Sequence, residues 1–205
     1  MFARTTTVIA RPSGIDRGIE YIRDVVMPAL QGIPGFVGLS TLVDRATGRC
    51  IITSSWQSPD SLHMSEAQVR GIRDRCAEHF DATETSVDQW EVAVMHRART
   101  SEQAASASVT WLEGDPATMG TLIDAFRDAV PRLEQLPGFT STSLLVDRRS
   151  GRAVSTVVYD AGAIAKARPH ESAIRTAVAD FAGAYVIEVA EFELAISQLR
   201  VPELV

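Results

Sequence analysis

The side chains that could do chemistry are aromatic rings and imidazoles close to predicted strand ends. The indole of Trp56 can stack on a flat aromatic ligand, and the phenol of Tyr159 can donate a hydrogen bond to a ligand oxygen. His63 and His170 follow on predicted helices, where an imidazole can act as a general base near neutral pH. Tyr21, on the flank of another predicted helix, could lie at the rim of a ligand pocket between the helices and the sheet. Each also has a structural interpretation, as a core aromatic or as a residue on a solvated helix face.

Other familiar site motifs do not occur in the sequence. It has no Gly-rich phosphate loop, no HExxH pair and no GxSxG elbow. Its two cysteines, Cys50 and Cys76, lie in the first half of the chain, and the second half has Ala153 and Val178 in their places. We therefore expect two buried thiols rather than a disulfide, and no metal site.

The elements that must position these side chains come from an internal repeat. Pro34-Gly35-Phe36 returns as Pro137-Gly138-Phe139, an offset of 103 residues (137 − 34), and Leu42-Val43-Asp44-Arg45 returns at the same offset. Ile72-Arg73 returns as Ile174-Arg175 at an offset of 102, so one residue is lost in between. A repeat of this length has the size of a small domain. We predict a first unit at 1–98, a linker at 99–106, a second unit at 107–198 and a tail at 199–205.

Each copy has the pattern strand, helix, strand, strand, helix, strand. In the first copy we predict strands at 2–11, 36–45, 49–57 and 87–96, one helix capped by Ser13, and another that begins at Ser58-Pro59 and breaks near Met64-Ser65. In the second copy we predict strands at 107–113, 138–147, 152–160 and 185–197, a helix from Asp115-Pro116, and a helix broken by Pro169.

The order βαββαβ is the ferredoxin-like plan, in which both helices cover one face of a four-stranded antiparallel sheet. The other face of the sheet also carries apolar side chains, which must be shielded from water. We expect the sheet of the second copy to bury this face. We therefore predict an α+β fold of two tandem ferredoxin-like units whose antiparallel sheets pack as a pseudo-dimeric α/β barrel.

Composition limits the class of protein and its partners. The chain has 205 residues, 45% of them hydrophobic, which is enough to bury a core. The net charge is −6 and the arginines are scattered among acids, so we expect no nucleic-acid partner. No apolar run reaches the roughly 18 residues of a membrane span, and the N-terminus lacks a signal-peptide pattern, so we expect a cytoplasmic protein with no membrane partner.

Both copies resemble the antibiotic biosynthesis monooxygenase family, a group of dimeric α/β-barrel proteins. In the first copy the resemblance runs from Pro34-Gly35-Phe36 to Trp56-Gln57-Ser58-Pro59-Asp60-Ser61-Leu62. In the second it begins at Pro137-Gly138-Phe139, but Tyr159 replaces the tryptophan and Asp160-Ala161-Gly162 replaces the cap. The resemblance covers nearly the whole chain and implies a tandem fusion of two such units.

The resemblance implies a cofactor-independent monooxygenase acting on a small electron-rich aromatic. His63 is then the candidate base, and Trp56, Tyr159, Tyr21 and His170 are the candidate pocket residues. Haem-degrading members use an Asn on the first strand, and the sequence contains no Asn, which disfavours that activity. Two alternatives stay open: a non-catalytic protein that binds a small aromatic or apolar ligand, and a purely structural barrel. The sequence also leaves open which copy carries a site and whether the fused chain forms a further homodimer.

Overall fold

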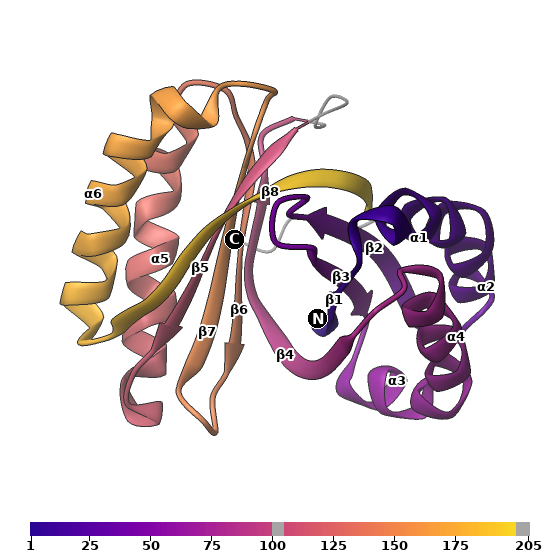
Figure 1. Cartoon of the computed structure of the whole chain (residues 1–205). Helices are drawn as coiled ribbons and strands as arrows, with labels where there is room; N and C mark the ends of the chain where they lie inside the picture. The colour runs from indigo at the N-terminus through magenta and orange to yellow at the C-terminus, as the bar shows by residue number, and fades with distance from the viewer. Residues whose placement is uncertain (100–104, 200–205) are drawn as a thin grey trace. The chain divides into compact units, whose positions relative to one another are not determined.

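The strand and helix order predicted for the first copy is present in the structure (Figure 1). The computed structural model describes residues 1–99 and 105–199, so the predicted tail and most of the predicted linker lie outside the described residues. The elements of the first copy are β1 (Phe2–Ile9), the 3-10 turn η1 (Pro12–Gly14), α1 (Ile15–Tyr21), the π-helical turn η2 (Ile22–Val26), α2 (Met27–Gln31), β2 (Phe36–Val43), β3 (Arg49–Trp56), α3 (Pro59–Met64), α4 (Glu66–His79) and β4 (Glu84–Arg97).

The second copy repeats this order with more regular helices. Its elements are β5 (Ser106–Glu113), the 3-10 turn η3 (Pro116–Thr118), α5 (Met119–Glu134), β6 (Phe139–Asp147), β7 (Arg152–Tyr159), α6 (Ile164–Ala182) and β8 (Tyr185–Leu199).

The hydrogen-bonding order of the strands confirms the predicted fold class. The eight described strands form a closed barrel in the order β1-β3-β2-β8-β5-β7-β6-β4. Within each copy this is the ferredoxin-like order, β4-β1-β3-β2 and β8-β5-β7-β6. The register of the two copies also matches, because Phe2 lies opposite Trp56 in the first copy and Ser106 lies opposite Tyr159 in the second.

The described chain divides into two compact units. The first comprises Met1–Trp90 with the end of β8 from Leu194 onward, and the second comprises Glu91–Glu193. Residues 91–97 of β4 pair with β6 inside the second unit. The last strand of each copy therefore contributes to both units.

Each unit buries one face of its sheet under helices (Figure 1). In the first unit α1, η2, α2 and α4 pack on β1, β2 and β3, and their shared core includes Ile22, Leu30, Leu39 and Phe80. In the second unit α5 and α6 pack on β5, β6 and β7, and their shared core includes Phe126, Leu133, Leu144, Ile174 and Val178. Apolar residues spaced three and four apart form one face of each helix, and apolar residues spaced two apart form one face of each strand. These two faces pack against each other, as the sequence patterns predict.

Of the two helix starts predicted in the first copy, one is confirmed and one is wrong. The hydroxyl of Ser58 accepts a hydrogen bond from the backbone N–H of Ser61, Pro59 is the first residue of α3, and the break before α4 is present, so this start is confirmed. The predicted cap at Ser13 is wrong, because Ser13 lies inside η1 and α1 begins without a side-chain cap.

The prediction that Pro169 breaks its helix is also wrong. The helix α6 runs through Pro169 without interruption. A proline removes one backbone donor, which leaves the carbonyl of Ala165 without its helical partner. Because Ala165 is exposed, water can satisfy that carbonyl, and the helix continues.

Candidate functional site

Each unit has a cavity between its sheet and its helices. The cavity of the first unit, which we name the β1–α4 cavity, is partly open, and its free space together with the adjoining open solvent is about 450 Å³. Its polar lining residues are Arg4, Thr6, Ser54 and Arg73, and its walls are apolar: Val8, Val26, Leu30, Leu39, Ile52, Val69, Ile72, Cys76 and Ala77. The corresponding cavity of the second unit, the β5–α6 cavity, is also partly open, and its free space together with open solvent is about 410 Å³. Its lining includes Thr110, Ser155, Glu171, Arg175 and several apolar residues of α5 and α6.

The two cavities occupy equivalent places in the repeat. Strand register equates Arg4, which lies opposite Ser54, with Ser108, which lies opposite Val157. The helical part of the repeat equates Ile72-Arg73 with Ile174-Arg175, so Val69 on α4 corresponds to Glu171 on α6. The same frame of sheet and helix therefore carries two different sets of polar groups.

The polar end of the β1–α4 cavity is organised by Arg4. Residues 4, 6 and 8 share one face of β1, the face toward the helices, so Arg4 enters the core with only 1% of its surface exposed. Its Nη1 donates to Ser65 Oγ at 3.1 Å, and its Nη2 donates to the carbonyl of Leu62 at 2.7 Å. Nη2 also lies 3.0 Å from a carboxylate oxygen of Glu66.

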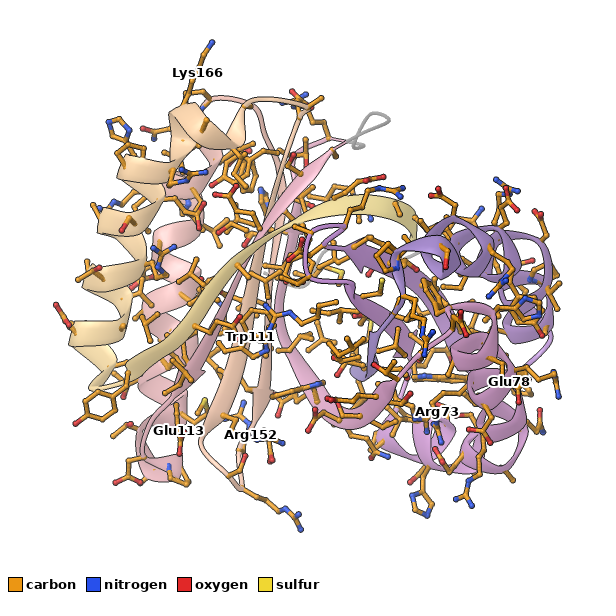
Figure 2. All side chains as sticks on the ribbon, viewed as in Figure 1. Arg73, Glu78, Trp111, Glu113, Arg152 and Lys166 are labelled. Carbon is orange, nitrogen blue, oxygen red and sulfur yellow. The ribbon has the colours of Figure 1, made fainter. Side chains whose placement is uncertain are left out.

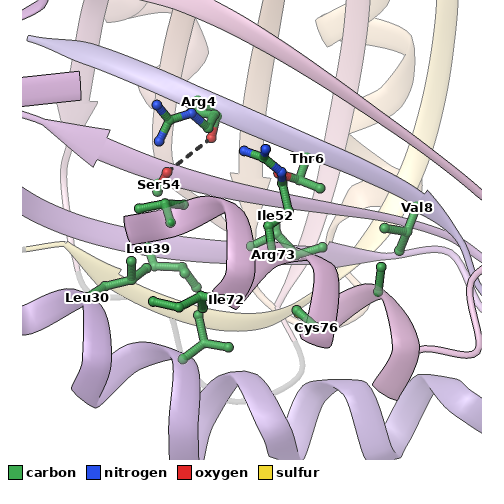
Figure 3. Close-up of a pocket in the computed structure, with 13 residues that line it drawn as sticks. Arg4, Thr6, Val8, Leu30, Leu39, Ile52, Ser54, Ile72, Arg73 and Cys76 are labelled. Carbon is green, nitrogen blue, oxygen red and sulfur yellow. Dashed lines mark hydrogen bonds between the residues drawn. The ribbon is translucent and has the colours of Figure 1, made fainter. Parts of the chain in front are cut away.

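The carboxylate of Glu66 joins the two arginines of this cavity. Its Oε1 accepts a hydrogen bond from Arg73 Nη2 at 3.0 Å, while its Oε2 faces Arg4. This hydrogen bond from Arg73 and the charge of Arg4 hold the pKa of Glu66 below its ordinary value. Burial lowers the pKa of Arg4, and the charge of Glu66 opposes that shift. Figure 3 shows Arg73 reaching from α4 toward the β1 strand beside Thr6.

Two guanidinium N–H groups at this end have no acceptor. Arg4 Nε and Arg73 Nη1 are both buried and make no hydrogen bond among the residues that the structure describes. Buried polar groups are normally paired, so two unpaired donors on residues that line one cavity are unusual.

The β5–α6 cavity carries its own acceptor. Glu171 is 4% exposed and accepts hydrogen bonds from Ser108 Oγ at 2.7 Å, from Tyr159 Oη at 2.9 Å and from Arg175 Nη1 at 3.2 Å. Burial, with the neighbouring Glu171 carboxylate, raises the pKa of the Tyr159 phenol, which keeps it protonated as a donor. The charge of Arg175 is therefore compensated inside this unit.

Trp56 and Tyr159 lie behind the polar ends of the two cavities. Both side chains are fully buried, and neither lines a cavity directly. The indole N–H of Trp56 donates to Ser54 Oγ at 3.1 Å, and the guanidinium carbon of Arg4 lies 5.9 Å from the centre of its ring. Each aromatic thus holds a polar residue that lines the cavity.

The other three residues selected from sequence lie outside the cavity linings. His63 is exposed on α3 and His170 is exposed on α6. Tyr21 is half-buried, stacks on His79 with ring centres 3.8 Å apart, and accepts a hydrogen bond from Arg75 Nε at 3.4 Å. The structure therefore brings Trp56 together with Arg4, and Tyr159 together with Glu171. His63, His170 and Tyr21 line neither cavity.

The charged residues of both cavities were not selected from the sequence. One usable signal was a charge on the buried face of a strand, because Arg4 shares that face with Thr6 and Val8. Another was the repeated Ile-Arg dipeptide on the second helix of each copy, which the sequence analysis used only as a mark of the repeat. Figure 2 shows Arg73 in the helical region of the first unit, whereas Lys166, the one lysine of the sequence, projects away from α6.

The described residues offer neither a metal-ligand cluster nor a helix that could cross a membrane. Across residues 1–99 and 105–199, no three His, Cys, Asp or Glu side chains gather as metal ligands would. No helix in that part of the chain combines the length and apolar character of a membrane-crossing segment. Cys50 and Cys76 are free and buried, as predicted.

Comparison with solved structures places the fold. A candidate monooxygenase of Lactobacillus acidophilus superposes with a TM-score of 0.70 at 12% identity, covering 97% of this chain and 96% of that one. An anthrone oxidase-like protein gives 0.66 at 13% identity, with 99% and 94% covered. A ferredoxin-fold protein of Listeria monocytogenes related to antibiotic biosynthesis monooxygenases gives 0.53 at 9% identity, with 95% and 94% covered. At these identities the likeness shows the fold alone, and it confirms the predicted resemblance.

Comparison of sequences gives the family. No family model matches the chain. The uncharacterized proteins Rv2557 and Rv2558 of Mycobacterium tuberculosis are each 46% identical to it over 100% of its length, and the matches cover 92% and 88% of those proteins. The chain therefore belongs to the family of these two mycobacterial proteins, and it has the antibiotic biosynthesis monooxygenase fold as a tandem of two ferredoxin-like units.

Proposed function

We propose that the chain is a cofactor-independent monooxygenase that oxidises a small electron-rich aromatic in the β1–α4 cavity. The observation that supports this most is the cavity itself, in which apolar walls lead to two arginines with unused donors. The fold adds support, because an anthrone oxidase-like protein and a candidate monooxygenase share it.

The proposed reaction needs no electrons beyond those of the substrate. A CH₂ group activated by flanking aromatic rings loses a proton, and the resulting anion reacts with O₂. One oxygen atom becomes the new carbonyl, the O–O bond breaks, and the other oxygen leaves as water with the two hydrogens of the former CH₂. The four electrons taken from carbon are those that O₂ accepts, so no separate reductant is required.

The residues of the cavity would contribute electrostatics and exclusion of water. The guanidinium groups of Arg4 and Arg73 favour the negatively charged form of a bound molecule, and the apolar walls strengthen that attraction by lowering the local dielectric. Glu66, whose pKa is lowered, is suited to holding the guanidinium groups rather than to accepting a proton. The proposal gives no role to His63, which is exposed outside the cavity.

Oxygen consumption tests this function. We expect the purified protein to consume one O₂ per molecule of anthrone, and labelled ¹⁸O₂ to deliver one atom to the product. Ala77→Phe fills the cavity from α4 and should abolish turnover, whereas Ala67→Phe changes an exposed position on the same helix and should not. A panel of anthrones and naphthols consumed no faster than in buffer would contradict the proposal.

A non-catalytic ligand-binding protein is the second candidate. The observation that favours it is that the described residues lining the β1–α4 cavity include no carboxylate and no imidazole, so a strong general base is not at hand. This candidate predicts saturable binding of aromatic ligands without any oxygen consumption.

A further inference from the structure

We propose that the β1–α4 cavity recognises an aromatic carboxylate, whose oxygens accept hydrogen bonds from Arg4 and Arg73. The aromatic body of this ligand rests on the function proposed above. The carboxylate rests on separate observations, namely the charge at the end of the cavity and the contents of the equivalent cavity in the second unit.

Among the residues that the structure describes, the positive charge at the polar end is not fully balanced. Arg4 and Arg73 have side chains that are 1% and 13% exposed, and both pair with the single carboxylate of Glu66. Arg70 also approaches Glu66, at 3.5 Å, but its side chain is 67% exposed and is screened by water. Two buried cations against one anion leave one positive charge, which a ligand with a single negative charge would neutralise.

The unused donors say where that ligand charge would bind. Arg4 Nε and Arg73 Nη1 are buried with no acceptor in the described part of the chain, and both residues line the same cavity. Figure 3 shows Arg4 and Thr6 on one strand with Arg73 facing them from α4. A carboxylate has two acceptor oxygens, so it can satisfy donors that come from two different elements.

The second unit contains an internal example of this arrangement. Its arginine at the place of Arg73 is Arg175, which is paired with the carboxylate of Glu171 at 3.2 Å. The same carboxylate accepts hydrogen bonds from Ser108, at the place of Arg4, and from Tyr159, at the place of Trp56. The first unit has Val69 where the second has Glu171 and takes its carboxylate from Glu66 instead, which faces both Arg4 and Arg73. A ligand carboxylate would give the first unit the ratio of one carboxylate to one arginine that Glu171 and Arg175 have in the second.

The remaining lining selects the rest of the ligand. Beyond the arginines, the cavity walls are aliphatic side chains with two hydroxyls, Thr6 and Ser54. Such walls favour an apolar ring over a polar or multiply charged body. A phosphate monoester would bring close to two negative charges where one is needed, so the carboxylate is the better match.

Binding of a matched pair of probes tests the inference. We expect 2-naphthoate to bind by isothermal titration calorimetry with one site per chain, and the neutral isostere 2-naphthamide to bind roughly 10- to 100-fold more weakly, the usual range for losing a charged hydrogen bond. Arg73→Gln should remove this preference. Arg70→Gln, which removes an exposed cation from the same helix and the same Glu66, should leave it in place. Equal loss in both variants, or equal affinity for the two probes, would overturn the inference.

A reciprocal exchange between the copies gives a test that does not rely on loss alone. Val69→Glu gives the first unit a second carboxylate beside Glu66 and should abolish naphthoate binding. Glu171→Val removes the carboxylate of the second unit and should create a second naphthoate site beside Arg175. Circular dichroism and thermal unfolding check that each variant is folded, and Arg73→Gln remains decisive if one is not. A Glu171→Val protein that is folded but gains no site contradicts the proposed equivalence.

The outcomes separate this inference from the proposed oxygenase. Naphthoate binding with the expected variant pattern but without oxygen consumption supports the carboxylate site and removes the oxygenase. Oxygen consumption on neutral anthrone, with no preference for naphthoate over naphthamide, supports the oxygenase and removes the carboxylate site.

Discussion

A buried arginine on a strand sets the character of the first cavity at the scale of single residues. Arg4 is held by a serine hydroxyl, a backbone carbonyl and a carboxylate, all of which belong to the α3–α4 region some 60 positions later in the chain. Its counterpart Ser108 is small and neutral, and there the carboxylate of Glu171 takes the central place. The two units thus carry different sets of polar side chains on the same scaffold, and only the first has the arrangement that we propose as a binding site.

Glu171 should be a major source of stability in the second unit. Glu171→Gln removes the charge that compensates Arg175, and loss of one partner of a buried pair typically costs about 3 kcal/mol of unfolding free energy. Glu191→Gln breaks an exposed ion pair with Arg168 in the same unit and should cost less than about 1 kcal/mol. Urea titrations of both variants measure the difference. Similar losses in the two variants would mean that Glu171 is not the centre of its cluster.

The two thiols should make the protein less stable in alkali. Burial raises the pKa of Cys50 and Cys76 from an ordinary 9.0 to about 12. The unfolded chain releases these protons from about pH 9 and the folded chain does not, so this contribution to stability is fully present below pH 9 and declines as the pH rises toward 12. Urea titrations at pH 8 and pH 10.5 should show the decline.

The second copy supplies the control for this prediction. The double variant Cys50→Ala, Cys76→Val has the residues found at 153 and 178, and its decline between the two pH values should be smaller. In the unmodified protein, both thiols should also resist a disulfide reagent at pH 8 until denaturant is added. Rapid labelling of the folded protein would contradict their burial.

At the scale of elements, sequence patterns predicted features set by neighbouring residues, such as a helix start. They did not predict contacts between residues that lie far apart in the chain. The start of α3 at Ser58 and Pro59 was predictable because a cap and a first-turn proline act within three residues. The capping of α1 by Ser13 was wrong because Pro12 and Gly14 form a 3-10 turn with it instead. The polar end of the cavity was not predictable, because the partners of Arg4 are set by how α3 and α4 fold back onto β1.

Two glycines with positive φ show that close contacts between distant residues, which the sequence alone does not reveal, also constrain the loops. Gly151, between β6 and β7, has a φ of +75°, and a Cβ there would overlap the carbonyl oxygen of Gly114. Gly162 has nearly the same φ, +73°, but a Cβ there would meet no heavy atom within 4 Å. The two glycines therefore separate the cost of backbone conformation from the cost of a close approach.

Alanine substitutions at these two glycines should differ in cost. Gly162→Ala should lower the unfolding free energy by about 1 kcal/mol, the cost of a left-handed conformation for a residue with a Cβ. Gly151→Ala should cost more than about 2 kcal/mol, because the turn must also move away from Gly114. Thermal unfolding of the two single variants measures both values. Equal losses would show that the close approach at Gly151 relaxes without penalty.

At the scale of the whole molecule, the repeat predicted the fold class, but the described units do not simply follow the two copies. Strand β4 begins in the first unit and pairs with β6 in the second, and β8 begins in the second unit and ends in the first. Each unit therefore depends on a strand that also belongs to the other. The predicted boundaries, 1–98 and 107–198, remain a prediction, and a cut in the chain can test whether either copy folds without the other.

Cleavage between residues 99 and 105 should leave the two pieces associated. A protease site inserted there would separate the copies covalently, yet residues 91–97 of β4 would still be paired with β6, and the end of β8 from Leu194 would still belong to the first unit. We expect the cut protein to elute from a sizing column at the position of the intact chain and to unfold in one transition, because neither piece can lose its shared strand without exposing a sheet edge. The piece from 105 onward, produced alone, should be unfolded or aggregated. Recovery of two folded monomers of half size would instead establish each copy as an independent domain, and the shared strands would then be dispensable for folding.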